Sequence, residues 1–263
     1  MQAFRCPAAL RRLPGFVLLP RPSWTVGARP GTYRSVACAL LIGNSDGIGL
    51  ALTERLLAAG WDVVGVSRSP SPLQAARYTH HVLDVRDTSY PAVLAGLVTE
   101  REVAVCVYCA GIGEFLDVSS LALERSVFEV NLLGAVSAAQ VVIPKMVSRG
   151  AGHFIGLSSQ ADEIVDAAAP SYAASKAGLS SYIEGLGLAC RPRGVYVTNV
   201  RFGFVDTKMA KASARPFMIS VQQAAGRVLY CMAKRPLRDT FPKRMAWVLA
   251  LLRCGHMVRR WFM

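Results

Sequence analysis

Two side chains in the stretch SYAASKAG, residues 171–178, have the types and the spacing for acid–base chemistry. Tyr172 and Lys176 stand four residues apart, so on a helix they would share one face. A free tyrosine has a pKa of about 10, and a lysine one helical turn away favours the ionised form. Tyr230 and Lys234 repeat the spacing, so spacing alone does not separate a catalytic pair from two amphipathic side chains.

A glycine-rich stretch, GNSDGIG, supplies a second chemical feature. Gly43, Gly47 and Gly49 follow the pattern G-x-x-x-G-x-G, directly after an apolar run and before an amphipathic stretch. Glycines in this position let the backbone turn sharply and approach a pyrophosphate at the N-terminus of the following helix. The pattern favours nucleotide binding over a plain loop.

Short apolar runs alternate with longer helical stretches from residue 37 onward, and these elements must position the residues above. Such alternation predicts a parallel sheet wound on both faces, a Rossmann-like α/β fold in one domain. The predicted strands cover residues 36–43, 62–69, 79–85, 103–111, 152–159 and 195–203, and the two longest predicted helices cover 123–147 and 171–190. We expect residues 1–36 to be a basic, disordered extension, 37–235 to form the domain and 236–263 to form a basic, apolar tail.

The net charge of +13 is divided unevenly along the chain. Residues 1–36 carry six arginines and no acid, residues 37–190 carry nine basic and fifteen acidic side chains, and residues 191–263 carry fifteen basic and two acidic ones. A mildly acidic body argues against a nucleic-acid-binding core, so no nucleic acid is expected as a partner. Basic ends suit an anionic surface such as a membrane, although solvated ends are the commoner explanation.

The cysteines and histidines do not show the spacing of metal ligands. The seven cysteines form no disulfide framework, which fits an intracellular compartment. Cys106 and Cys109 lie three apart on a predicted strand, so they should point to opposite faces and share no metal or redox role. The four histidines also lack ligand spacing, and we predict no metal site.

No apolar run reaches the length that we expect of a membrane-spanning helix. Residues 1–36 make a poor secretory signal; a disordered extension, a misread start and an organelle presequence are alternative interpretations. The tail combines the apolar run MAWVLALL with Arg253, Arg259 and Arg260, so it either lies in a membrane interface or packs on protein. We expect a cytoplasmic protein, with peripheral membrane contact and organelle targeting as alternatives.

The glycine loop resembles that of the short-chain dehydrogenase/reductase family, and further landmarks of this family occur in order along the chain. Asp84, in LDV, matches the family residue that contacts the adenine ring. The stretch CAG, residues 109–111, stands where the family usually has N-A-G at the end of the fourth strand. FGFVDT, with Thr207, resembles its P-G-x-x-x-T segment beside the nicotinamide, so the resemblance covers roughly residues 37–210.

The resemblance also separates Tyr172 from Tyr230. Ser159 precedes Tyr172 by thirteen residues, which is the family's spacing, and Tyr230 has no such serine upstream. The resemblance implies that Tyr172 is the general acid in carbonyl reduction and that Ser159 holds the carbonyl oxygen. Lys176 would lower the pKa of the tyrosine and bind the nicotinamide ribose, and Asn131 would hold a water molecule for proton relay.

The same resemblance implies a cofactor site along the ends of the predicted strands. Its residues would be Gly43, Asn44, Ser45, Gly47, Ile48, Gly49, Ser67, Arg68, Asp84, Val85, Ala110, Gly111, Tyr172, Lys176, Val205 and Thr207. An acid at the end of the second strand would bind the ribose of NAD, but this chain has Ser67 and Arg68 there. Arginine pairs well with a phosphate, so NADP(H) is favoured over NAD(H).

Several residues depart from the family pattern. Asp46 stands in the glycine loop where many NADP enzymes carry a basic or neutral residue, which weakens the NADP preference slightly. Cys109 replaces the asparagine of N-A-G, and Phe202 replaces the proline of P-G, so the loop over the nicotinamide could differ in shape. The family's final strand, with V-D-G-G, has no counterpart in the sequence.

Together these features predict an NADP(H)-dependent oxidoreductase that interconverts a carbonyl and a secondary alcohol, working as a reductase in a homo-oligomer (dimer or tetramer). Residues 207–220, with Met209, Phe217 and Met218, would form a short lid over an apolar pocket, which favours a lipophilic substrate. One alternative is a catalytically quiet NADP-binding regulator or scaffold. Another is an epimerase or dehydratase, which would need a longer chain.

Overall fold

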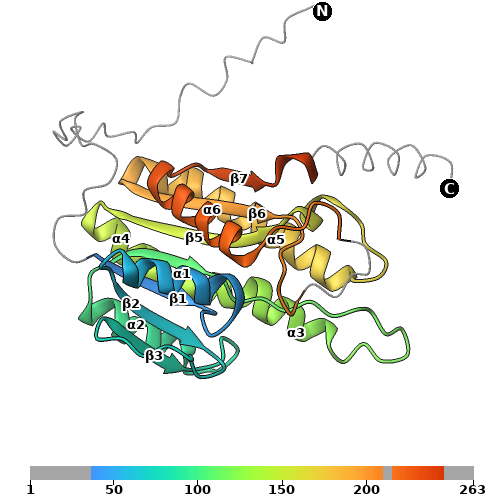
Figure 1. The fold of residues 1–263 in the computed structure, drawn as a ribbon, viewed down its shortest axis with the longest axis horizontal. Coiled ribbons are helices and arrows are strands. Elements are labelled where there is room, and N and C mark those ends of the chain that lie inside the picture. Colours follow the sequence, from blue (N-terminus) through green and yellow to red (C-terminus); the bar gives the residue numbers. More distant parts are fainter. Residues whose placement is uncertain (1–36, 210–214, 246–263) are drawn as a thin grey trace, which may run out of the picture. The chain divides into compact units, whose positions relative to one another are not determined.

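Seven parallel strands form one sheet in a computed structural model of the chain, which describes residues 37–209 and 215–245 (Figure 1). Their order across the sheet is β3-β2-β1-β4-β5-β6-β7, so the chain builds the sheet outward in both directions from β1. The strands are β1 (Cys38–Ile42), β2 (Asp62–Ser67), β3 (Tyr78–Val82), β4 (Val103–Tyr108), β5 (Gly152–Ser159), β6 (Val195–Phe202) and β7 (Arg238–Phe241). The predicted doubly wound α/β fold is confirmed.

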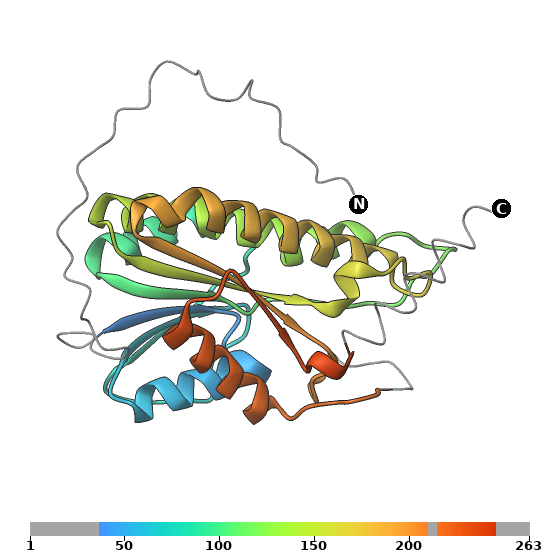
Figure 2. The same cartoon turned by 90° about the horizontal axis from the view of Figure 1, so that it is seen from above.

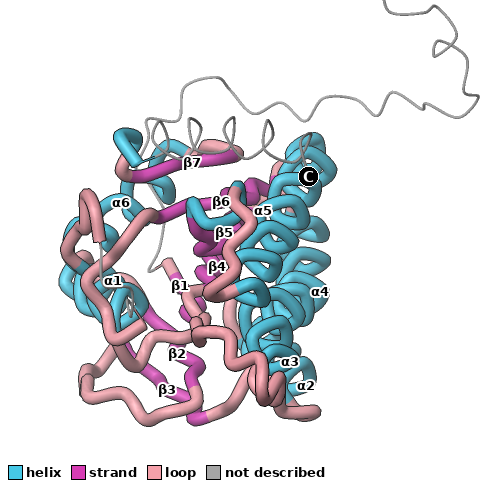
Figure 3. Tube along the Cα trace, turned by 90° about the vertical axis from the view of Figure 1, so that its right-hand side faces the viewer, coloured by secondary structure: helices cyan, strands magenta, loops and turns pink. Residues whose placement is uncertain are grey.

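Helices cover both faces of this sheet. Figure 3 shows α2, α4 and α5 on one side of the strands and α1 and α6 on the other, and Figure 2 shows the same layers from above. The helices are α1 (Gly47–Ala58), α2 (Tyr90–Glu100), α3 (Glu124–Phe128), α4 (Gly134–Arg149), α5 (Pro170–Cys190) and α6 (Val221–Lys234). Crossovers between parallel strands usually contain a helix, and here all but the one from β2 to β3 do, so the alternation in the sequence becomes this three-layer arrangement.

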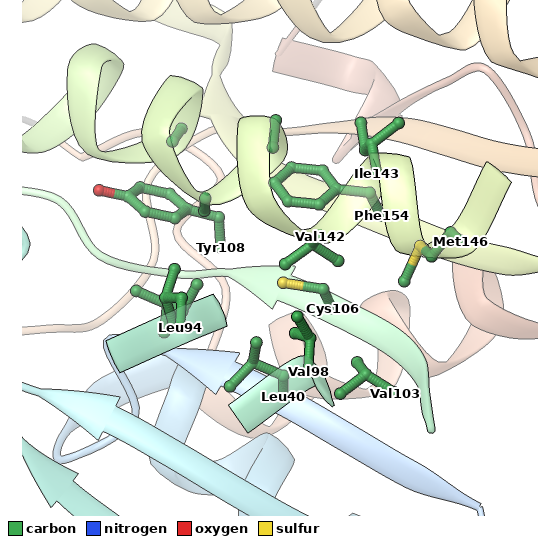
Figure 4. Close-up of a cluster of buried hydrophobic side chains, with 14 of the residues drawn as sticks. Leu40, Leu94, Val98, Val103, Cys106, Tyr108, Val142, Ile143, Met146 and Phe154 are labelled. Atoms are coloured by element: carbon green, nitrogen blue, oxygen red, sulfur yellow. The ribbon is translucent and has the colours of Figure 1, made fainter. Parts of the chain in front are cut away.

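Alternate side chains of each central strand enter two separate cores. In β1, Leu40 and Ile42 belong to the core beneath α2, α4 and α5, and Ala39 and Leu41 belong to the core beneath α1 and α6. Figure 4 shows the first core, where Phe154 of β5 lies among side chains from the strands and the covering helices. A strand that is buried on both faces is apolar at most positions, which explains the nearly continuous apolar runs in the sequence.

The helix predicted over residues 123–147 is present, but it is not a regular α-helix throughout. Between α3 and α4 the chain forms a π-helical segment, Glu129–Leu133, and the backbone amide of Gly134 donates to the carbonyl of Glu129, five residues earlier. This wider turn contains Asn131, whose side chain is fully buried. Single π-helical turns within α-helices occur frequently at functional sites.

The end of the domain differs from our prediction. We placed it at residue 235 and expected no further strand, but Arg238–Phe241 pairs in parallel with β6 as β7. Only one of its four residues, Phe241, is apolar, so the segment lacks the pattern of a buried strand. An ion pair between Arg227 of α6 and Asp239 fastens this edge strand to the rest of the fold. Residues 246–263, where we expected a membrane or packing segment, lie outside the described residues.

One helical run is longer and more apolar than our sequence analysis allowed. Glu124–Arg149, which joins α3 to α4, has the length and composition of a membrane span, although half of its most apolar window is buried inside the fold. Ala138, Val142 and Met146 pack into the core against the sheet. A core helix that covers a sheet passes the same test, and here the burial explains the apolar composition.

Candidate active site

The predicted site residues meet at the carboxyl edge of the sheet. They line a cleft of about 630 Å³ that runs past the ends of β1, β2, β4, β5 and β6. The cleft lies where the strand order reverses around β1, the place where ligands bind in open parallel sheets. Every residue predicted to bind a cofactor lines it except Asn44, and every predicted catalytic residue lines it except Asn131.

The glycine loop forms a backbone cradle at the N-terminus of α1. Gly43 and Gly47 have φ values of +86° and +53°, a region that favours glycine. A Cβ at Gly43 would lie 2.5 Å from the amide nitrogen of Ala110, and one at Gly49 would lie 2.2 Å from the carbonyl oxygen of Gly43. The loop therefore requires its glycines, and the free amides at the helix N-terminus fit the pyrophosphate of a dinucleotide.

The adenosine end of the cleft contains the residues expected to choose the cofactor. Arg68 is exposed at the end of β2, and Ser67 is buried beside it. Asp84, which we expected to contact adenine, accepts hydrogen bonds from Arg86 Nε and Nη2 at 3.0 and 2.7 Å. The Arg86 guanidinium beside Asp84 holds the pKa of that carboxyl below its usual range. The carboxylate is therefore charged but already paired.

A hydrogen-bond chain that the sequence did not reveal supports both the glycine loop and the end of β2. Asn44 Nδ2 donates to Tyr78 Oη at 2.8 Å, and Tyr78 Oη lies 2.9 Å from His80 Nδ1. His80 Nε2 lies 3.1 Å from the carbonyl oxygen of Ser69 and 3.3 Å from Ser67 Oγ. Asn44 is thus buried beneath the cleft, where it orients other groups. Tyr78 and His80 stand on β3 and belong to none of the motifs, so no sequence signal indicated them.

The proposed proton-transfer residues come from two neighbouring elements. Ser159 ends β5, and Tyr172 and Lys176 lie on α5, which packs against β5 and β6. Lys176 Nζ donates to the carbonyl oxygen of Leu157 at 3.0 Å and lies 5.9 Å from the centre of the Tyr172 ring. Ser159 Oγ accepts a hydrogen bond from the amide of Ala161 at 3.1 Å. The hydroxyl, the phenol and the ammonium group therefore face one part of the cleft.

Burial dominates the titration of this pair. Burial lowers the pKa of Lys176 to about 8, because a desolvated ammonium is disfavoured. Burial also raises the pKa of Tyr172, while a hydrogen bond with Ser159 acts in the opposite direction. We expected Lys176 to lower the pKa of Tyr172. Desolvation of the tyrosinate is the largest effect on the pKa of Tyr172, and the expected influence of Lys176 stays a prediction.

Asn131 lies behind the cleft and bonds to protein groups. Its Nδ2 donates to the carbonyl oxygen of Ile112 at 2.9 Å and to Ser175 Oγ at 3.0 Å. Its Oδ1 accepts from the amide of Ile112 at 2.8 Å. The Asn131 side chain therefore fixes the segment after β4 against α5, and its expected role in holding a water molecule stays a prediction. The π-helical turn around Asn131 brings this side chain to that position.

The loop after β6 closes the cleft over the glycine loop. The Thr207 methyl group would lie 3.4 Å from a Cβ at Gly47, and Lys208 Nζ pairs with Asp46 at 2.7 Å. Asp46 also caps α1 by accepting from the Gly47 amide. The acid that weakened the NADP preference is therefore partly neutralised by a basic neighbour.

The two substitutions in the family motifs fit the local packing. Cys109 is partly buried against the core beneath α1 and α6, and Cys106 lies in the opposite core, as we predicted from their spacing. Phe202 ends β6 and is buried beside Phe241, its partner on β7. In the described part of the chain, no three His, Cys, Asp or Glu residues group as metal ligands.

The predicted lid is only partly where we expected it. Met209 lines the cleft beside Gly113 and Tyr172, whereas Phe217 and Met218 are exposed and do not line it. Residues 210–214 lie outside the described part of the chain. Met245, which we did not predict, lines the cleft from the segment after β7.

Comparisons with known proteins agree with this geometry. A family model described as short chain dehydrogenase matches residues 37–216, more than half of the chain. An uncharacterised oxidoreductase from Myxococcus xanthus is 30% identical over 235 residues, which are 84% of this chain and 90% of the relative.

Solved structures share the fold. A short chain dehydrogenase from Burkholderia cenocepacia, in complex with NADP, superposes with a TM-score of 0.76 at 24% identity, covering 85% of this chain and 97% of that chain. A short chain dehydrogenase from Leptospira borgpetersenii, with bound NAD+, has a TM-score of 0.70 at 18% identity, covering 78% and 91%. The glycine loop, the strand order and the match to the family model agree. The chain belongs to the short-chain dehydrogenase/reductase family and is an NAD(P)-dependent oxidoreductase.

Proposed function

We propose that this protein is an NADP(H)-dependent reductase that converts a lipophilic carbonyl compound to a secondary alcohol. One observation carries the proposal: Ser159, Tyr172 and Lys176 face one part of a cleft whose other part is the glycine cradle. A nicotinamide cofactor, when bound, supplies the hydride. The protein must then orient the carbonyl and deliver a proton to the oxygen.

The side chains in the cleft can perform these two tasks. The Ser159 hydroxyl donates a hydrogen bond to the carbonyl oxygen, and the Tyr172 phenol transfers its proton to the same oxygen. A raised pKa keeps Tyr172 protonated at neutral pH, which is the form that a reductase needs. Lys176, with a pKa of about 8, stays mainly charged at pH 7 and stabilises the tyrosinate that remains.

The end of β2 supports a preference for NADP(H). Arg68 is exposed at the rim of the cleft, next to Ser67 and Ser69, and no acidic residue follows the strand. A guanidinium in this position pairs with a 2′-phosphate, whereas NAD(H) offers it only a hydroxyl. The nearby carboxylate of Asp84 is bound to Arg86, which reduces its repulsion of a phosphate.

The remaining part of the cleft supports an apolar substrate. Its lining beyond the catalytic groups consists mainly of hydrophobic side chains: Ile112, Phe115, Ile164, Phe204, Met209 and Met245. Such a wall stabilises a bound hydrocarbon group by removing it from water, at about 25 cal/mol per Å² of apolar surface. A carbonyl compound with a bulky apolar part therefore fits better than a sugar.

The test is consumption of NADPH with a panel of aldehydes, ketones, steroids and long-chain keto-lipids, with NADH in parallel. We expect turnover with NADPH and an apolar substrate, and loss of at least about a hundredfold in Tyr172→Phe, which folds but has no proton to transfer. Tyr230→Phe is the matched control, because Tyr230 has the same lysine spacing but lies on α6 outside the cleft lining. Full activity of Tyr172→Phe would refute the mechanism, and tight NADPH binding without turnover on any substrate would favour a regulator.

A further inference from the structure

A buried ion pair lies beside the catalytic groups but outside the lining of the cleft. Arg201, on β6, donates from Nε to Asp162 Oδ2 at 2.7 Å, and its Nη2 donates to Asp162 Oδ1. The two side chains are only 5% and 4% exposed, so both charges are removed from water. Arg201 Nη2 also donates to Glu163 Oε1 at 2.7 Å. Burying such charges costs several kcal/mol, and the pair by itself is weak evidence for stability.

Hydroxyl groups connect this ion pair to the helix that carries the catalytic residues. Ser180 Oγ, on α5, donates to Asp162 Oδ2. Ser158 Oγ donates to the carbonyl oxygen of Lys176 at 3.1 Å, and it contacts Ser180 Oγ at 2.7 Å. The Asp162 carboxylate is thus held between β6 and α5, and Ser180, which binds it, contacts the serine that binds the backbone of Lys176.

The ion pair also fixes the turn that comes after Ser159. Asp162 lies in the 3-10 turn Gln160–Glu163, which begins at the residue after Ser159. In the register of β5 and β6, Arg201 stands opposite Ser158 and Phe202 stands opposite Ser159. Any displacement of this turn relative to β6 would therefore move the hydroxyl that is aimed at the substrate.

We propose that Asp162 and Arg201 are positioning residues for proton transfer: they fix the turn that orients Ser159 and set the charge around Tyr172. The inference rests on the proposed function, because it assigns their role to the same proton-transfer step. Arg201 holds the Asp162 carboxylate in place and offsets its negative charge. Neither residue touches the substrate.

The charge of Asp162 reaches both titrating groups of the site. Burial is the largest effect on both groups, and the charge of Asp162 adds a smaller one, which acts to raise the pKa of Tyr172 and that of Lys176 because a nearby negative charge disfavours the tyrosinate and favours the ammonium. Among the described residues, the Cys109 thiol faces Lys176 from the end of β4. Glu114 and Asp166 carry the other carboxylates that line this end of the cleft.

The direction in which Asp162→Asn should shift the pKa of Tyr172 can therefore be predicted. The amide keeps the shape of the carboxylate but leaves the Arg201 guanidinium with less compensation. Tyr172 then experiences more positive charge, so its pKa falls. Asp162 acts on Tyr172 less strongly than burial does, and we expect a measurable downward shift of the Tyr172 titration midpoint.

The first experiment measures this shift without any substrate. The protein is labelled with 13C at the tyrosine Cζ, saturated with NADP+ and titrated by NMR, and the Tyr172 signal is the one lost in Tyr172→Phe. We expect its titration midpoint to move to lower pH in Asp162→Asn. An unmoved midpoint would overturn the proposal even if the reductase activity is confirmed.

The control is a similar ion pair elsewhere in the fold, between a helix and a strand. Arg227 of α6 and Asp239 of β7 form the same type of pair, with Nε to Oδ2 at 2.7 Å and Asp239 9% exposed, away from the cleft lining. Asp239→Asn should reduce stability but leave the Tyr172 titration unchanged. An equal shift in both variants would show a general effect of lost charge and would overturn the proposal.

The second experiment separates position from charge, and it needs a substrate found by the activity panel. Arg201→Lys keeps the positive charge but loses the bidentate hydrogen bonding to Asp162. We expect kcat to fall about tenfold with little change in KM, and the pH at which reduction declines to stay the same. An Arg201→Lys variant with wild-type kcat would overturn the positioning role, and this test holds even if Asp162→Asn does not fold. If no substrate turns over but the NMR shift is seen, the proposed function fails while the electrostatic link stands.

Discussion

At the scale of single residues, the cleft shows how identical spacings acquire different roles. Tyr172 and Tyr230 each have a lysine four residues later, but only Tyr172 lies in the cleft, with Ser159 and Lys176. Tyr230 is 45% exposed and stacks against Arg227, whose guanidinium lies 4.2 Å from the ring centre. The surrounding elements, and not the i,i+4 spacing, distinguish the two tyrosines.

Arg68 should decide the choice of cofactor. Arg68→Ala removes the exposed guanidinium at the end of β2, and a hydrogen bond to a charged group contributes about 1.5–3 kcal/mol. We expect kcat/KM for NADPH to fall about tenfold or more, while the value for NADH changes little. Steady-state kinetics with both cofactors measures this difference.

Arg77 provides the control for that substitution. It is also exposed and basic, but it precedes β3 and so lies at the amino end of the parallel strands, where its Nη1 donates to the carbonyl oxygen of Gly60. Arg77→Ala should leave both values unchanged. Equal losses for NADPH and NADH in Arg68→Ala would contradict a phosphate-binding role.

At the scale of elements, the sequence predicted well those helices and strands that depend on local pattern. All six predicted strands and the helix over 171–190 are present, and in the central strands burial on both faces explains the largely apolar runs. β7 was missed because three of its four residues are polar and its stability comes from pairing with β6 and from the Arg227–Asp239 ion pair. The π-helical turn around Asn131 was missed because it has no sequence signature of its own.

In the site, too, residues in local patterns were predicted and residues held by long-range contacts were missed. Residues in contiguous motifs, such as the glycine loop, were predicted because the chemistry fixes their local backbone. Tyr78, His80, Asp162 and Arg201 were missed because they also bind residues that are distant in the sequence, and such pairings cannot be read from the chain alone. Long-range hydrogen bonds are therefore the part that only the structure supplied.

The Tyr78 hydroxyl should matter for cofactor binding through the element that carries it. Tyr78→Phe keeps the ring in β3 but breaks the link from Asn44 to His80, and so loosens both the glycine loop and the end of β2. We expect KM for NADPH to rise several-fold with kcat nearly unchanged, because the group touches neither substrate nor Tyr172. A normal KM would show that the hydrogen-bond chain is dispensable for the cofactor site.

At the scale of the whole molecule, stability should depend on one buried histidine. His153, in β5, is 1% exposed, and its Nε2 lies 2.8 Å from Thr198 Oγ1 on β6. Burial, and to a lesser extent the charge of Arg235, lowers the pKa of His153 from 6.5 to about 3. The native protein therefore keeps this imidazole neutral in a pH range where the unfolded chain binds a proton.

Proton linkage determines how the free energy of unfolding should change with pH. Because the unfolded state takes up the proton first, the free energy of unfolding should decrease as the pH falls below about 6.5, by roughly 1 kcal/mol per pH unit toward pH 4. His153→Gln removes the titrating group and retains a hydrogen-bonding partner for Thr198, so its loss of stability should be shallower over the same range. Urea unfolding at several pH values measures both slopes. Parallel slopes for the two proteins would show that His153 is charged in the native state or that another group governs acid unfolding.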